Sequence, residues 1–181
     1  MVIDARKARF ELRPLRADDA MRVAALSADS AIADAMVNSP PPAPVSEVRR
    51  FVEACQRGEQ VGSSVYRAIV DADELVGVVA LHPIDSVNRS AELMVWVGRA
   101  FWGRGLASKA VNSMVRDAFE CHGLNRIYAY HLWRSKAPAR VLAAAGFVRE
   151  GVLRQARLRK GGFEDVVQCA LLHEDWRSSF L

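Results

Sequence analysis

The chain has 181 residues, 51% of them hydrophobic, and a formal net charge of +4. This length suits one domain with a substantial core, and the longest apolar runs fall far short of the ~20 residues that span a bilayer. Acidic residues are interspersed with the basic ones, which argues against a nucleic-acid-binding protein. We therefore expect a single domain over residues 1–181, with neither nucleic acid nor a membrane as a partner.

The cysteines are odd in number and widely spaced, so a disulfide framework is not expected. The first residues (Met1–Arg6) lack the apolar stretch of a signal peptide. Both features favour a cytoplasmic protein with reduced thiols. The adjacent Cys121 and His122 have no second pair at ligand spacing, so we expect no bound metal.

The first third of the chain is predicted to contain one strand and two helices, with a proline-rich loop between the helices. The strand, first helix, loop and second helix are expected at residues 10–13, 18–26, 39–44 and 46–56. Pro14 should end the strand, and Ser46 should cap the second helix. Two roles stay open for residues 39–56: a simple connector, or a cover over an acceptor pocket.

Three strands and a long helix are predicted for the middle of the chain. The strands are expected at residues 65–70, 75–81 and 91–97, and the helix continues to Glu120. A polar turn, Asp71–Glu74, joins the first two strands. Apolar side chains recur along one side of the helix, at Leu106, Ala107, Ala110, Val111, Met114, Val115, Ala118 and Phe119. Such a stripe is typical of a helix that packs on a sheet.

The last third is predicted to form a strand, a helix that Gly146 ends, and a hairpin around Lys160–Gly162. The strand, the helix and the two hairpin strands are expected at residues 126–131, 136–145, 148–157 and 163–172. A basic cluster lies in the hairpin and comprises Arg149, Arg154, Arg157, Arg159 and Lys160. This cluster predicts a solvated sheet face or, alternatively, an electrostatic attraction for an anionic cofactor or an acidic partner.

Residues 91–108 combine an apolar strand, a turn with Gly103 and Gly105, and a helix start. A helix N-terminus behind a glycine turn presents unpaired N–H groups to an anion. The spacing does not fit a P-loop, because no Gly-Lys-Ser/Thr follows a glycine at the required distance, and it fits the dinucleotide fingerprint only loosely. We therefore predict that this turn binds the phosphates of a different cofactor.

The sequence Trp102-Gly103-Arg104-Gly105-Leu106-Ala107 resembles the acetyl-coenzyme A signature of the GNAT N-acetyltransferases, Gln/Arg-x-x-Gly-x-Gly/Ala. Tryptophan in the Gln/Arg place is usual in the branch that resembles the RimJ/RimL ribosomal-protein acetyltransferases. Other fragments typical of that branch follow in order at residues 12–20, 123–127, 140–142, 145–147, 150–154 and 164–167. The resemblance implies an α/β (α+β) domain with the GNAT fold: one mixed, mostly antiparallel, twisted sheet of six to seven strands flanked by about four helices.

The resemblance also implies that the co-substrate is acetyl-coenzyme A (acetyl-CoA). Its pyrophosphate is expected on the backbone N–H groups of Gly103–Ser108, and its pantetheine arm along Val95–Val97, where a bulge opens the sheet. A main-chain N–H of that strand would face the thioester oxygen. The residues expected to contact the cofactor are Val95, Trp96, Val97, Trp102, Gly103, Arg104, Gly105, Leu106, Ala107, Ser108 and Ser135.

Glu92 is the candidate general base, because it lies on the same strand as that backbone. The alternative role for Glu92 is an ion pair with a nearby arginine. The family segment Asn-x-x-Ser after the fifth strand is replaced here by Ser135 and Pro138, so Ser135 is the second catalytic candidate. Leu142 stands where other members have a tyrosine general acid. Neither usual acid is therefore present. Because the pKa of a thiol is ~8.5, the coenzyme A sulfur is expected to leave as a thiolate without full protonation.

Four other residues have a candidate role in the site. Asp165 occupies the place of an acidic residue common in this branch and is a candidate for holding the acceptor amine. His82, His131 and Trp133 lie at strand ends, where a catalytic site could use them and where a structural role is the alternative.

The leading hypothesis is an acetyl-CoA-dependent N-acetyltransferase that modifies a primary amine by direct attack in a ternary complex. The acceptor is expected to be a protein N-terminal α-amine or a small amino compound. The absence of the usual general acids favours an alternative, a catalytically weak acyl-CoA-binding or regulatory protein on the same fold. The resemblance further implies a homodimer.

Overall fold

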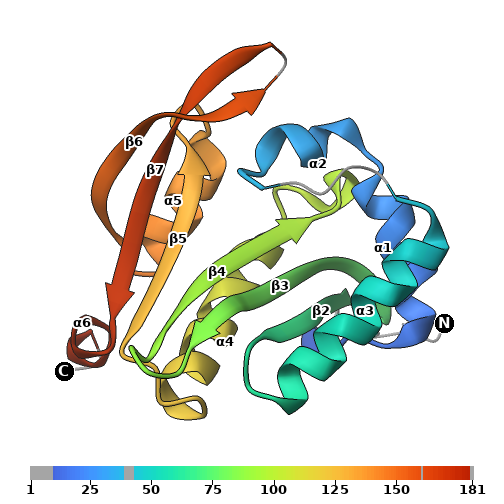
Figure 1. The fold of residues 1–181 in the computed structure, drawn as a ribbon, viewed down its shortest axis with the longest axis horizontal. Coiled ribbons are helices and arrows are strands. Elements are labelled where there is room, and N and C mark those ends of the chain that lie inside the picture. The colour runs from blue at the N-terminus through green and yellow to red at the C-terminus, as the bar shows by residue number, and fades with distance from the viewer. Residues whose placement is uncertain (1–9, 39–42, 160, 180–181) are drawn as a thin grey trace, which may run out of the picture.

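The computed structural model describes residues 10–38, 43–159 and 161–179, and these form one seven-stranded sheet with helices on both faces (Figure 1). The strands are β1 (Glu11–Pro14), β2 (Val65–Asp71), β3 (Glu74–Asp85), β4 (Ser90–Val97), β5 (Arg126–Leu132), β6 (Val148–Arg159) and β7 (Gly162–Leu172). Their order in the sheet is β1-β2-β3-β4-β5-β7-β6. Only β4 and β5 are parallel neighbours, so the predicted mixed, mostly antiparallel sheet is confirmed.

The described residues form six α-helices, two more than expected, and two short 3₁₀ helices. They are η1 (Ala17–Asp19), α1 (Ala20–Ser27), α2 (Ser30–Ala35), α3 (Val45–Gln60), η2 (Arg99–Phe101), α4 (Leu106–Glu120), α5 (Lys136–Ala144) and α6 (His173–Ser178). Sequence periodicity missed α2 and α6, because each has only six residues and therefore too few turns to show an apolar stripe.

The start predicted for α3 was wrong. Pro44 is the N-cap residue, and Ser46 lies inside the helix, which also continues four residues beyond the expected end at Gln56. Proline has no backbone N–H, and a helix uses none from the residue at its N-terminal boundary. The helix can therefore begin directly after the proline-rich loop. Of that predicted loop, residues 39–42 lie outside the described residues.

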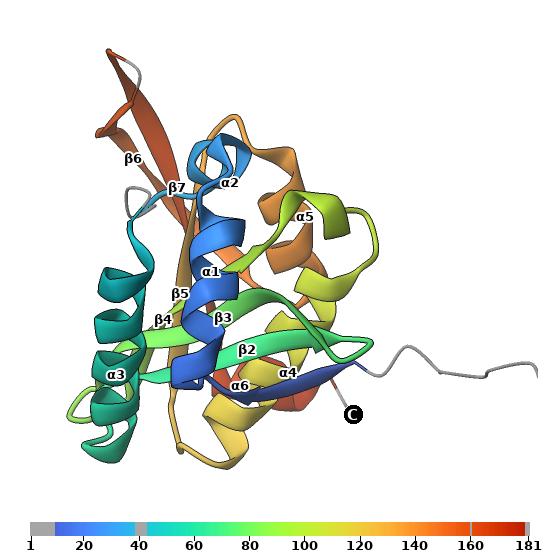
Figure 2. The same ribbon diagram turned by 90° about the vertical axis from the view of Figure 1, so that its right-hand side faces the viewer.

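Helices cover both faces of the sheet and bury two hydrophobic clusters. The predicted stripe of α4 is buried, together with residues of α5, against one face. Helices α1 and α3 pack on the other face, over β2 and β3. Figure 2 shows α3 on one side of the sheet and α4 and α5 on the other. Among the described helices, none is long and apolar enough to cross a bilayer.

Strands β4 and β5 pair over only three residues each, Ser90–Glu92 with Arg126–Tyr128, and then separate (Figure 1). The bulge expected at Val95–Val97 was wrong. Those residues pair with β3 in regular register, and the irregularity lies on β3 between Leu81 and Ile84. The sheet is therefore opened by the divergence of β4 from β5.

Candidate active site

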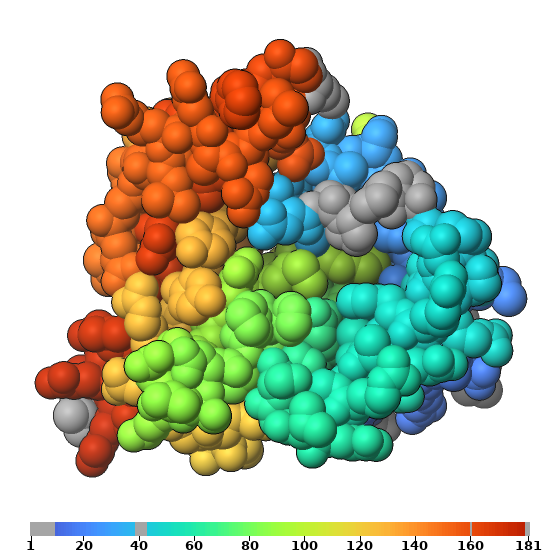
Figure 3. Space-filling model, in the orientation of Figure 1, coloured from blue at the N-terminus to red at the C-terminus, as the bar shows by residue number. Residues whose placement is uncertain are grey.

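A cleft of about 770 Å³ opens where β4 and β5 separate. It is lined by β4, β5, α2, the start of α4 and the residues that lead into and form α5. Figure 3 shows a hollow over β4, between the β6–β7 hairpin and α2. Both catalytic candidates and all the predicted cofactor contacts except Arg104 line this cleft, namely Glu92, Val95, Trp96, Val97, Trp102, Gly103, Gly105, Leu106, Ala107, Ser108 and Ser135. One cavity thus joins the glycine turn to the candidate base.

The glycine turn needs glycine at two positions. Gly103 and Gly105 have φ angles of +77° and +73°, in the left-handed region that other residues rarely adopt. Gly105 is the N-cap residue of α4 and offers no side chain to cap the helix. The first N–H groups of α4 have no partner within the helix, so they are free to bind an anion that enters the cleft.

Two side chains of the turn fasten it to the sheet. The indole Nε1–H of Trp102 donates to the Val97 carbonyl oxygen at 2.6 Å. The Arg104 guanidinium donates to the Asp71 carboxylate at 2.5 Å and does not line the cleft. Arg104 is therefore the one predicted cofactor contact that the structure directs elsewhere.

Helix α5 brings two further cations to the cleft, Lys136 and Arg140, which sequence reasoning missed. Their spacing of four residues places them on one face of the helix, and this was the signal that could have found them. Within the described part of the chain neither forms an ion pair. They are therefore available to an anionic ligand.

The start of α5 otherwise agrees with the sequence analysis. Ser135 is the N-cap residue, although its side chain makes no capping hydrogen bond. Pro138 and Leu142 line the cleft, so neither place supplies a side chain that can donate a proton. Of the hydroxyl-bearing residues that line the cleft, Ser135 is the nearest in sequence to Pro138 and Leu142.

The backbone of β4 presents alternate residues to the gap. The Gly98 N–H donates to the Val76 carbonyl, so the polar groups of Gly98 point toward β3. Because backbone groups of successive residues point to opposite sides of a strand, those of Val97 and Val95 point away from β3 and into the gap. The Val97 carbonyl is occupied by Trp102, and Val95 keeps both its N–H and its C=O toward the cleft.

Glu92 lies where the two strands begin to separate, and it lines the cleft. Burial raises the pKa of Glu92 above its ordinary value, and the positive charge of Arg157 on β6 partly offsets this rise. Burial also raises the pKa values of Tyr66 and Tyr128, and the charge of Glu92 adds to both effects. Among the residues that the structure describes, Glu92 has no ion-pair partner.

The four remaining candidates do not line the cleft. Asp165 accepts a hydrogen bond from the Gln155 N–H at 2.7 Å and so holds the irregular part of β6. His131 is buried, with Nδ1 2.9 Å from the Leu132 carbonyl oxygen. The Trp133 ring lies under the Arg149 guanidinium, and His82 packs against Tyr66. None of these four contacts involves a residue that lines the cleft.

Helix α2 and the residues that follow it, up to Asn38, line one side of the cleft. Three arginines from across the cleft hold this segment: Arg134 donates to the Asp34 carbonyl, Arg157 to the Asn38 side chain, and Arg159 to the carbonyls of Ala33 and Met36. Cations at a helix C-terminus also complement its dipole. Helix α2 thus lines the cleft and α3 does not, while residues 39–42 of the segment for which a cover was one alternative lie outside the described residues.

No group of three or more His, Cys, Asp or Glu side chains in the described ranges is arranged to hold a metal ion. The site combines a glycine turn, a strand backbone open to the cleft and the half-buried carboxylate of Glu92. A mixed sheet that opens along these parts is the arrangement that the resemblance to the N-acetyltransferases led us to expect.

Comparison with known proteins identifies the family. The acetyltransferase (GNAT) domain profile matches residues 9–148, and the chain belongs to this family. It is an N-acetyltransferase.

The relatives named here match between two thirds and nearly all of the chain. The uncharacterized N-acetyltransferase p20 of Bacillus licheniformis is 29% identical over 93% of this chain and 95% of its own. The ribosomal-protein-serine acetyltransferase of Escherichia coli (strain K12) is 26% identical over 66% of this chain and 67% of its own. A solved structure of RimL, a ribosomal L7/L12 alpha-N-protein acetyltransferase in complex with coenzyme A, has a TM-score of 0.85 at 20% identity and covers 95% of this chain and 98% of its own. That last likeness concerns the fold.

Proposed function

We propose that the protein transfers an acetyl group from acetyl-CoA to a primary amine by direct attack in a ternary complex. The observation that carries this proposal is the continuous cleft between the glycine turn and Glu92. A single cavity lets a thioester and an amine meet without a covalent enzyme intermediate. No cysteine lines the cleft that could act as a nucleophile, because Cys55 and Cys169 are buried elsewhere and Cys121 follows α4.

The residues of the cleft fit coenzyme A. The turn has no Cβ at Gly103 or Gly105, so the backbone can approach a pyrophosphate closely. Lys136 and Arg140 supply positive charge for the phosphates on the opposite wall. The Val97 N–H and the Val95 C=O also face the gap, and they offer one donor and one acceptor to an extended pantetheine arm, as an added strand would use them.

In the proposed reaction, the Glu92 carboxylate accepts a proton from the amine, directly or through water. The amine nitrogen forms a bond to the thioester carbon, and the Val95 N–H donates to the oxygen on which negative charge develops. The carbon–sulfur bond then breaks and the sulfur leaves as a thiolate, whose ordinary pKa is near ~8.5. Pro138 and Leu142 donate no proton, so the thiol takes its proton from solvent.

The acceptor is proposed to be a protein N-terminal α-amine or a small amino compound. The similarity to a ribosomal-protein-serine acetyltransferase supports the first class. A cytoplasmic location and a homodimer accompany the proposal as predictions.

The test is coenzyme A release from acetyl-CoA in the presence of a panel of amines and N-terminal peptides. We expect acetyl-CoA-dependent thiol release with at least one amine. The missing general acids favour a second candidate, an acyl-CoA-binding protein with little catalysis. Tight coenzyme A binding without turnover on any amine would support that candidate, and absence of binding would exclude both.

A further inference from the structure

Asp71 is a buried carboxylate that the proposed chemistry does not use. It ends β2, and only 6% of its surface is exposed. A carboxylate removed from water is costly unless a cation and hydrogen bonds compensate it. The compensating cation is Arg104, whose Nη2 lies 2.5 Å from Oδ2 of Asp71.

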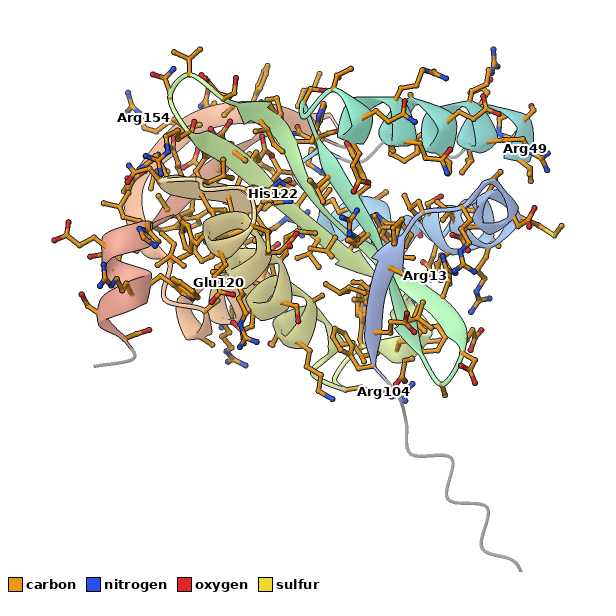
Figure 4. The ribbon with its side chains drawn as sticks, turned by 90° about the horizontal axis from the view of Figure 1, so that it is seen from below. Arg13, Arg49, Arg104, Glu120, His122 and Arg154 are labelled. Atoms are coloured by element: carbon orange, nitrogen blue, oxygen red, sulfur yellow. The ribbon has the colours of Figure 1, made fainter. Side chains whose placement is uncertain are left out.

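Arg104 comes from the glycine turn, 33 residues away in sequence. It stands between Gly103 and Gly105, yet its side chain points out of the cleft and also lies over the Phe101 ring. Figure 4 shows Arg104 beside the start of β1, at the edge of the sheet. Asp71 lies in the same place, because Val70 pairs with Glu11 of β1.

A contact of this kind would restrain the glycine turn. Its two glycines are the residues with the greatest backbone freedom, so a loose turn would lose much entropy when its N–H groups converge on a phosphate. The sheet holds Asp71 in place, because Asp71 pairs with Glu74 at the end of the β2–β3 hairpin. The ion pair thus restricts the turn before any ligand arrives.

We propose that the Asp71–Arg104 ion pair positions the glycine turn, so that the backbone N–H groups of Gly103–Ser108 bind the pyrophosphate, while Arg104 itself does not touch the cofactor. This inference rests on the proposed function, since it takes acetyl-CoA as the ligand. Asp71 and Arg104 are positioning residues, and they act on cofactor affinity rather than on the chemical step.

The experiment compares Asp71→Asn and Arg104→Met in the full-length protein with two thioester substrates. With acetyl-CoA, each variant is expected to raise KM about tenfold, which corresponds to ~1.4 kcal/mol, with kcat changed less than about twofold. With acetylpantetheine, which lacks the pyrophosphate, KM should not change. The double variant should be no worse than either single variant, because the two residues form one contact.

The matched control is Glu59→Gln. It breaks the Arg67–Glu59 ion pair, which also involves β2 but lies outside the cleft. This variant is expected to leave KM for acetyl-CoA unchanged. The charge-reversed pair Asp71→Arg with Arg104→Asp should recover part of the affinity that each single variant loses.

Any of four results would overturn the inference. If Arg104→Met weakens binding and Asp71→Asn does not, Arg104 is itself a phosphate ligand. If both variants raise KM for acetylpantetheine equally, the ion pair is merely structural. If calorimetry shows that the unmodified protein binds no coenzyme A, both this inference and the proposed function fail. If the unmodified protein binds coenzyme A and Asp71→Asn binds it equally well, only this inference fails.

Discussion

Glu92 lies where the proposed reaction needs a general base, and substitution of this residue tests that role. It lies at the last pair of β4 with β5, at the mouth of the gap. Partial burial raises the pKa of Glu92 and so makes the carboxylate a better proton acceptor than an exposed one. Tyr66 and Tyr128 flank it without supplying a positive charge.

We expect Glu92→Gln to lower turnover about a hundredfold while leaving the affinity for coenzyme A unchanged. The amide keeps the shape of the side chain but accepts no proton. Steady-state kinetics and calorimetry measure the two effects separately. Glu150→Gln is the control, since that carboxylate is paired with Arg126 outside the cleft. Equal losses in the two variants would contradict the assignment of Glu92 as the base.

The pH dependence follows from the same residue. Only the ionised carboxylate accepts a proton, so kcat/KM should rise as the pH rises through the pKa of Glu92. Burial moves that rise to a higher pH than an exposed glutamate would give. In Glu92→Gln this part of the pH–rate profile should disappear, and a profile like that of the unmodified enzyme would exclude Glu92.

Gly105 gives a second prediction at the scale of one residue. In Gly105→Val the side chain would be strained at a φ of +73° and would occupy space in front of the turn, where no protein atom lies within 4 Å. We expect about a tenfold loss of coenzyme A affinity, measured by calorimetry. Gly123→Val is the matched control, because Gly123 has a φ of +60° and equal space but lies outside the cleft. Unchanged affinity in Gly105→Val would refute the phosphate-turn assignment.

Among the elements, α2 is the one that we expect to act on the acceptor amine. It is a short helix without an apolar stripe of its own, and arginines of β6 and the β5–α5 segment hold its C-terminal carbonyl groups. These contacts join residues a hundred or more positions apart, as in Arg159 and Met36, which are separated by 123. The hairpin and α2 therefore close one side of the cleft together.

Arg159→Met should loosen this closure, because it removes the donors to Ala33 and Met36. We expect KM for the acceptor amine to rise about three- to tenfold, with KM for acetyl-CoA unchanged. Arg154→Met is the control on the same strand, since Arg154 is exposed (Figure 4) and does not line the cleft. Two-substrate kinetics separates the two KM values, and a rise confined to acetyl-CoA would contradict the role given to α2.

The elements also show where sequence reasoning succeeds. The stripe of α4 and the hairpins were predictable, since helix and strand periodicities depend on neighbouring residues. The start of α3 was not, because Ser46 resembles a capping residue while Pro44 fills the place. Helices of six residues, such as α2, are decided by what they pack against.

For the whole molecule, the net charge of +4 favours the binding of the anionic cofactor that we propose. Coenzyme A is a polyanion, and Lys136 and Arg140 face the cleft. Coenzyme A at about 100 times its Kd should raise the stability by ~2.7 kcal/mol, and thus Tm by about 5–10 °C for a domain of this size. Added salt should weaken the binding of coenzyme A but not that of pantetheine, because salt screens only charged contacts. A Tm that does not respond to coenzyme A would contradict the cofactor assignment.

The sequence by itself determined the local structure of the glycine turn. The Gly103-Arg104-Gly105 spacing, the strand before it and the helix after it are local features, and local backbone preferences decide them. The tertiary structure alone decided the rest: the separation of β4 from β5, the place of α2 beside the cleft, and the pairing of Arg104 with Asp71. Those depend on strand register and on contacts between distant segments, which no neighbouring residue encodes. Arg104 illustrates the difference, since its place in the motif predicted a ligand contact and its buried partner directs it to the sheet.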